Sequence, residues 1–140
     1  TGRSLRGLVA DPAIVTDDEI DVAFELANQP GAQKAFLDLL RKYCTVFGVN
    51  RREIIRIQAN LPQITMPTLI IWGELDSILP PAAAQVALAR MPNARLTVMD
   101  GCGHMPYVEG PSRFNSLLAD YMQQVESGTW RQVDNSSQDR

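Results

Sequence analysis

The sequence is poor in several features that mark particular classes of protein. It contains one histidine and only two cysteines, Cys44 and Cys102. The cysteines follow no paired spacing, so no disulfide framework is predicted and a reducing compartment such as the cytoplasm is the default. No apolar run approaches the roughly 20 residues needed to cross a bilayer, so no membrane partner is expected.

Positive charge is also scarce. Lysine and arginine number 13 against 16 acidic residues, which gives a net charge of -3 and a pI of about 5.1. Nucleic-acid-binding domains usually carry a basic patch, so nucleic acid is not expected as a partner. The apolar fraction of 45% over 140 residues indicates a globular chain that is long enough for one compact domain.

The first half of the chain has the pattern of helices. The segment Thr16–Glu19 has the form of a capping box, and apolar residues follow it at the spacing of one helical face until Pro30 and Gly31. A second apolar stripe predicts a helix over residues 32–43. A third begins after a cap at residues 50–53 and includes Ile54, Ile57 and Leu61. Core packing is the expected use of these stripes.

The second half alternates strands and helices. The run Thr68–Gly73 is apolar, β-branched and ended by glycine, as in a strand covered on both faces. A helix over residues 80–91, a strand over 95–99 and a helix over 111–125 follow. This order predicts an α/β fold with two parallel strands and flanking helices. From Glu126 the chain is polar, and we expect it to fray.

Two titratable side chains follow the two predicted strands. His104 lies in a glycine-flanked loop after the second strand, and Asp76 lies in the loop after the first. Taken alone, each has an ordinary interpretation, His104 as a polar turn residue and Asp76 as a helix cap. Loops at the carboxyl ends of parallel strands meet at one edge, however, so a carboxylate and the imidazole are expected to pair there. Glu74 is the competing carboxylate.

These two segments resemble the α/β-hydrolases, and specifically their carboxyl-terminal part. Residues 66–80 are similar to the family's acid strand and loop, and residues 101–115 to its histidine loop and closing helix. The resemblance implies that Asp76 is the acid and His104 the base of a catalytic triad, with no metal and no organic cofactor. It also implies an organisation into a helical cap at 1–63, a βαβα part of the core at 64–125 and a tail at 126–140.

The helical half carries a second resemblance. Residues 11–19 and 28–36 are similar to the cap of the hydrolases that cleave carbon–carbon bonds in aromatic ring breakdown, the meta-cleavage product hydrolases, and of related esterases and lipases. The implied reaction is hydrolysis of an ester or carbon–carbon bond in a small acyl or carbonyl substrate. Ile78 and Met105, which adjoin the two loops, are candidates for the walls of the substrate pocket.

One part of the triad is missing from the sequence. A nucleophile elbow of the form Gly-x-Ser-x-Gly is absent, because Ser4 follows Gly2 but precedes Arg6 at the matching position. The family's oxyanion loop, which supplies backbone amides, is absent as well. We therefore expect a fragment of a serine-type hydrolase that is inactive alone and self-associates through an exposed sheet edge or helix exchange. Cys102 as nucleophile, a metal site at Asp100, Cys102 and His104, and a non-catalytic binding or dimerisation module are the alternatives.

Overall fold

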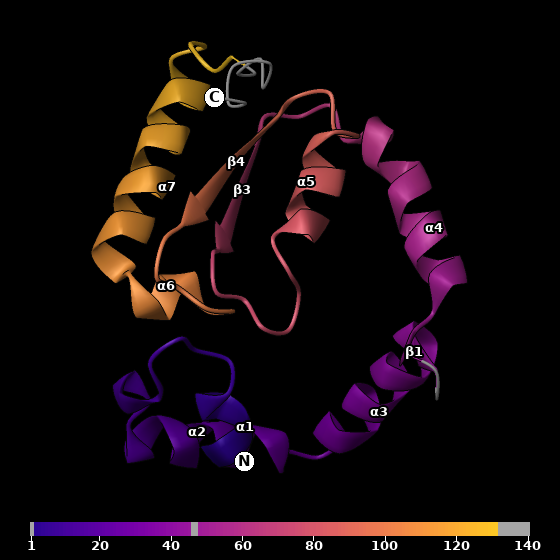
Figure 1. Cartoon of the computed structure of the whole chain (residues 1–140), viewed down its shortest axis with the longest axis vertical. Coiled ribbons are helices and arrows are strands. Elements are labelled where there is room, and N and C mark those ends of the chain that lie inside the picture. The colour runs from indigo at the N-terminus through magenta and orange to yellow at the C-terminus, as the bar shows by residue number, and fades with distance from the viewer. Residues whose placement is uncertain (1, 46–47, 132–140) are drawn as a thin grey trace. The chain divides into compact units, whose positions relative to one another are not determined.

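The computed structural model describes residues 2–45 and 48–131, and their contacts divide the chain into two units (Figure 1). The first unit consists of residues 1–7 and 11–60. The second consists of Leu8–Ala10 and the chain from Leu61 onward. The short segment Leu8–Ala10 therefore groups with the second unit, although the sequence on both sides of it belongs to the first. Within the described residues, no helix is long and apolar enough to cross a membrane.

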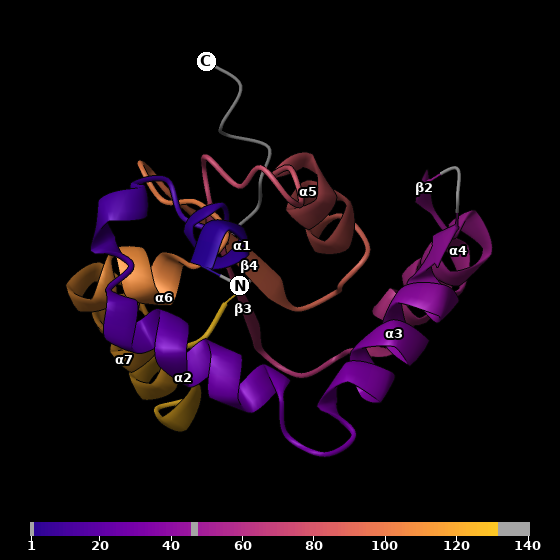
Figure 2. The same cartoon turned by 90° about the horizontal axis from the view of Figure 1, so that it is seen from below.

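The first unit is built mainly from helices. It contains α1 (Gly2–Arg6), a 3-10 turn (Pro12–Ile14), α2 (Asp17–Ala27), α3 (Ala32–Tyr43) and α4 (Arg51–Asn60). The predicted capping box is confirmed, since the Thr16 hydroxyl accepts from the Glu19 amide and the Glu19 carboxylate accepts from the Thr16 amide. Beside it, α1 lies against α2 (Figure 2), where Arg6 forms an ion pair of 3.0 Å with Asp17.

A short antiparallel hairpin separates α3 from α4. Its strands are β1 (Cys44–Thr45) and β2 (Gly48–Val49), and the sequence pattern did not predict them. The hairpin is followed by Asn50. Its side chain accepts from the Arg52 amide at 3.2 Å and so caps α4 as expected.

The second unit has the predicted alternation. It contains a 3-10 turn (Leu61–Gln63), β3 (Thr68–Gly73), α5 (Ala82–Leu88), β4 (Ala94–Met99), α6 (Pro106–Glu109) and α7 (Pro111–Glu126). β3 and β4 are parallel and in register from Thr68 opposite Ala94 to Gly73 opposite Met99, which confirms the expected pairing. α5 is shorter than the predicted helix over 80–91. It begins at Ala82, directly after its N-cap Pro81, and ends at Leu88.

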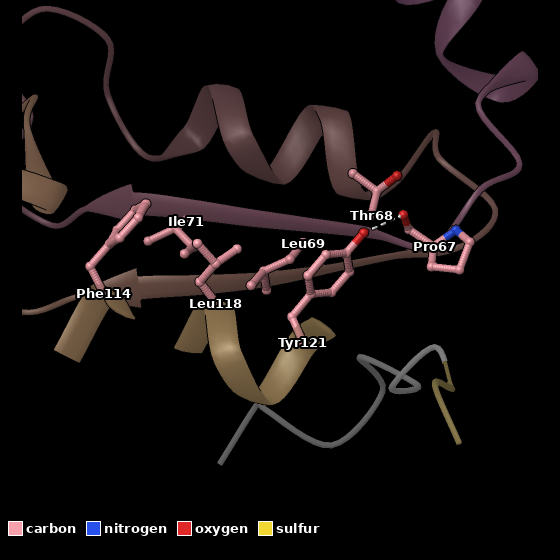
Figure 3. Close-up of a pocket in the computed structure, with 7 residues that line it drawn as sticks. All are labelled: Pro67, Thr68, Leu69, Ile71, Phe114, Leu118 and Tyr121. Carbon is pink, nitrogen blue, oxygen red and sulfur yellow. Dashed lines mark hydrogen bonds between the residues drawn. The ribbon is translucent and has the colours of Figure 1, made fainter. Parts of the chain in front are cut away.

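Helices cover both faces of this two-stranded sheet, with α5 on one side and α7 on the other (Figure 1). Leu88, Met91 and Ala94 form the buried core on the α5 side, with Ile70 packed against them. On the α7 side an open apolar pocket of about 330 Å³ lies along β3 (Figure 3), and its lining residues are Pro67, Thr68, Leu69, Ile71, Phe114, Leu118 and Tyr121. The apolar run of β3 is explained by these two covered faces.

The chain beyond α7 differs from the expected fraying at Trp130. This side chain is only 7% exposed, packs edge-on against Tyr121 at 5.1 Å between ring centroids, and donates its indole N–H to Asn93. The Arg95 guanidinium stacks over the same ring at 4.1 Å. One large aromatic side chain therefore ties this end to the sheet, although the residues around it are polar. Residues 132–140 of the expected tail lie outside the described residues.

Candidate active site

Asp76 lies in the loop after β3. Its carboxylate is buried, and both of its oxygens have hydrogen-bond partners. The side chain is 4% exposed, and Oδ1 accepts the backbone N–H groups of Ile78 and Leu79, each at 2.9 Å. Burial raises the pKa of this carboxyl, but the donors from Leu79, His104 and Ile78 outweigh burial and hold the pKa below its usual value. Asp76 is therefore an ionised acceptor at neutral pH.

His104 lies in the loop after β4 and meets Asp76 directly. Its Nδ1 is 2.8 Å from Asp76 Oδ2, so the predicted pairing of the two loops is present in the structure. A carboxylate at Nδ1 favours the tautomer with the proton on that nitrogen and leaves Nε2 as the basic nitrogen. The imidazole is about one third exposed, at 34%, so a reacting group has access to it.

Glu74, the competing carboxylate, has a different partner. Its Oε2 accepts the backbone N–H of Gly101 at 3.1 Å, at the start of the histidine loop. Its own amide donates to Met99 and the Leu75 amide donates to Cys102, so this segment runs along the end of β4. Asp76, and not Glu74, is thus the carboxylate at the imidazole.

Two glycines allow the loops to approach closely. A Cβ at Gly73 would lie 1.8 Å from the carbonyl oxygen of Gly103, and a Cβ at Gly103 would lie 2.8 Å from the amide nitrogen of Ala10. Both distances are shorter than any atom pair tolerates. Side chains at these two positions would separate the end of β3, the histidine loop and the segment Leu8–Ala10, and the imidazole would move with its loop.

A pocket of about 140 Å³ adjoins the pair, and its lining residues are Ile71, Trp72, Gly73, Asp76, His104 and Pro106. The Trp72 indole is anchored by a hydrogen bond to the Leu79 carbonyl at 2.9 Å. Sequence reasoning gave no pocket role to Trp72 or Pro106, although both directly adjoin the motif residues. Ile78 and Met105 do not line this pocket. Ile78 acts there through its amide, which donates to Asp76, and its side chain is 53% exposed.

Neither alternative use of the histidine loop has support in the structure. Burial raises the pKa of the Cys102 thiol and the nearby Glu109 carboxylate raises it further, so the reactive thiolate is disfavoured. Asp100, Cys102 and His104 do not gather, and in the described ranges no three histidine, cysteine or acidic side chains lie together as a metal site requires.

The fold and this pair define a class of protein. An acid and a histidine stand on the loops that follow two adjacent parallel strands, in the chain order used by α/β enzymes with a catalytic triad. The family model described as the alpha/beta hydrolase fold matches residues 12–111. The chain therefore belongs to the α/β-hydrolase fold family.

Individual relatives agree with this assignment. A 2-hydroxy-6-oxononadienedioate/2-hydroxy-6-oxononatrienedioate hydrolase of Cupriavidus pinatubonensis is 27% identical over 122 residues, covering 86% of this chain and 39% of the relative. A monoacylglycerol lipase of Mus musculus is 29% identical over 79 residues, covering 56% of this chain and 24% of the relative. The solved structure of a meta-cleavage product hydrolase from Pseudomonas fluorescens has a TM-score of 0.69 at 25% identity, covering 88% of this chain and 44% of that one. The chain thus spans less than half the length of each.

Proposed function

We propose that this chain supplies the acid and the base of a serine-type hydrolase whose nucleophile lies outside the 140 residues. Asp76 and His104 are the two catalytic residues in this proposal. The observation that carries it is the contact of 2.8 Å between Asp76 Oδ2 and His104 Nδ1, with the second carboxylate oxygen held by two amides. A buried carboxylate in this position orients the imidazole and stabilises its protonated form.

The proposed reaction follows from the free nitrogen of His104. Nε2 accepts the proton of an approaching serine hydroxyl while the serine oxygen bonds to the substrate carbonyl carbon. The imidazolium then returns the proton to the leaving group, which departs from the acyl-enzyme. In the second half, Nε2 takes a proton from water as the water oxygen bonds to the acyl carbon. The imidazolium then gives that proton to the serine oxygen as the bond between serine and the acyl carbon breaks, which restores the serine hydroxyl and the neutral imidazole. Asp76 keeps its charge throughout. No metal ion or organic cofactor takes part in this sequence.

The substrate class is a small acyl or carbonyl compound, cleaved at an ester or at a carbon–carbon bond. Support comes from the relatives, which include both a hydrolase of 2-hydroxy-6-oxo acids and a monoacylglycerol lipase. The pocket of about 140 Å³ beside His104 is below the usual size for a whole ligand, which fits a site for the reacting carbonyl alone. The helices of the first unit are proposed to act as a cap. Ile78 and Met105 do not line the pocket of about 140 Å³, and they are proposed as walls of the larger substrate pocket of the extended protein. Both cysteines are free, which supports the cytoplasm as location.

A second candidate is a non-catalytic binding or dimerisation module. It is favoured by apolar side chains that are more than half exposed on the helices of the first unit, such as Phe24, Phe36 and Ile55. In addition, the edge of β3 away from β4 pairs with no strand of the described part of the chain. Self-association through this edge or through the helices is the corresponding partner proposal.

Activity of an extended protein distinguishes the two candidates. The coding sequence immediately upstream of Thr1 should be read, and the protein extended to include an in-frame Gly-x-Ser-x-Gly should be assayed with an aryl ester and a 2-hydroxy-6-oxo acid. We expect turnover that His104→Ala abolishes and that Asp76→Asn lowers about 10⁴-fold in kcat, because the amide favours the wrong tautomer. Glu74→Gln is the matched control and should retain turnover.

The 140-residue chain itself is expected to be inactive toward both substrates. Turnover by the chain alone that is lost in His104→Ala would show that the nucleophile is present after all. An upstream sequence without the elbow motif, together with dimers in light scattering that dissociate on substitution of Phe24 or Phe36, would support the module instead.

A further inference from the structure

A second carboxylate, that of Glu109, accepts from three donors, as does that of Asp76. Glu109 is the last residue of α6, and its side chain accepts three backbone N–H groups. The Ala10 amide donates to Oε2 at 2.6 Å, the Gly103 amide to both oxygens at 2.8 Å, and the Met105 amide to Oε1 at 3.1 Å. Sequence reasoning assigned Glu109 no role, although it lies within the histidine segment.

Two of these donors flank His104 on either side. The amides of Gly103 and Met105 converge on one carboxylate, which fixes the chain before and after the histidine. The His104 amide itself donates to the carbonyl of Leu8 at 2.7 Å. Because Glu109 also holds Ala10, it binds the histidine loop and the segment Leu8–Ala10 to a single group. The backbone from which the imidazole extends is thus restrained at three consecutive residues.

We propose that Glu109 is a positioning residue for His104, which sets the loop so that Nδ1 reaches Asp76. This inference rests on the proposed function for its catalytic meaning, but its structural part stands on the contacts alone. The three donors require acceptors on both oxygens, so a carboxylate meets the need and an amide does not. In Glu109→Gln an NH2 group replaces one oxygen and faces backbone N–H groups, which forces the loop to move.

The single histidine allows a direct test in the full chain. Long-range ¹H–¹⁵N correlation spectra report which imidazole nitrogen carries the proton, and only His104 contributes. We expect the wild type to be protonated at Nδ1, with a downfield proton shared with Asp76. In Glu109→Gln we expect a mixture of tautomers and loss of the downfield signal. Glu74→Gln replaces a carboxylate that accepts from Gly101 on the same loop, keeps an oxygen that can accept this N–H, and should leave the wild-type spectrum.

Amide hydrogen exchange provides an internal control in the same samples. In Glu109→Gln we expect exchange at Ala10, Gly103 and Met105 to become at least about tenfold faster, since local opening no longer breaks hydrogen bonds to a carboxylate. The amides of Ile78 and Leu79, which Asp76 holds, should keep their rates. A role in general stability would instead accelerate both sets.

The spectra and folding of the Glu109 variants test whether this side chain positions His104. A folded Glu109→Gln chain with the wild-type tautomer and downfield proton would overturn the proposal. If this variant fails to fold, Glu109→Asp, which keeps the charge on a shorter side chain, should fold with an intermediate tautomer ratio. Failure of both variants to fold would make Glu109 a stability residue and would also overturn the proposal.

In the extended, active protein, Glu109→Gln should lower kcat up to about 10²-fold with little change in KM, as displacement of a catalytic group by about 1 Å does. If His104→Ala left turnover intact, the proposed function would fail, whereas the spectroscopic result on Glu109 would stand.

Discussion

The two units of this chain are stabilised in different ways. In α2, α3 and α4 of the first unit no residue is buried, and Phe36 is 60% exposed. Their hydrogen bonds and ion pairs are mostly local, as between Lys34 and Asp38. In the second unit, contacts join residues far apart in sequence, such as Tyr121 to Pro67 and Glu109 to Ala10. Local signals are enough to form helices, but the candidate site needs the unit with long-range contacts.

The largest loss of stability should come from adding a side chain at Gly73, where β3 meets the histidine loop of the second unit. In Gly73→Ala the new Cβ would lie 1.8 Å from Gly103 O and 2.5 Å from Cys102 O, both backbone atoms that cannot turn aside. We expect destabilisation above about 3 kcal/mol, beyond ordinary overpacking. Both tryptophans, Trp72 and Trp130, lie in this unit, so their fluorescence reports its unfolding.

Two controls make this comparison specific. Gly7→Ala, in the first unit, places its Cβ 3.4 Å from the carbonyl oxygen of Arg3, an ordinary contact, and should leave the fluorescence midpoint unchanged. The helical circular dichroism of Gly73→Ala should fall only by the share of α5, α6 and α7. Complete loss of helix would show that the first unit depends on the second for its structure.

The same contrast explains what sequence reasoning could predict. The helix cap at Thr16 and the strand Thr68–Gly73 follow from local patterns, and the Asp76–His104 pair follows because parallel strands bring their carboxyl ends to one edge. The contacts of Glu109 and the burial of Trp130 were not predicted. Glu109 meets Ala10 across 99 residues, and no periodicity or motif spacing marks such a contact. Pairing through regular structure is predictable, whereas contacts between irregular segments are not.

A smaller loss of stability in the second unit is expected from acid, and it arises at Asp76. The pKa of Asp76 is lower in the folded chain than its usual value near 4. Between these two values the unfolded chain binds more protons, so the free energy of unfolding rises with pH there. The contribution of Asp76 is therefore fully present above about pH 4 and is lost as the pH falls through the lowered pKa.

Denaturant titrations followed by tryptophan fluorescence between pH 6 and pH 3 measure this dependence. The wild type should lose more stability on acidification than Asp76→Asn, which has no carboxylate to protonate. Asp21→Asn, at an exposed position on α2, should keep the wild-type slope. Equal slopes in the wild type and Asp76→Asn would contradict the lowered pKa.

The smallest change in the free energy of unfolding should come from truncating an exposed apolar side chain of the first unit. Phe36→Ala removes a ring that is already mostly in water and adds a better helix former, so we expect a change within about 0.5 kcal/mol. Leu88→Ala, in the core between α5 and the sheet, is the matched contrast and should cost about 2–5 kcal/mol. If Phe36→Ala cost as much as Leu88→Ala, the ring would be covered in solution. A concentration-dependent unfolding midpoint that disappears in the variant would identify the cover as a second copy of the chain.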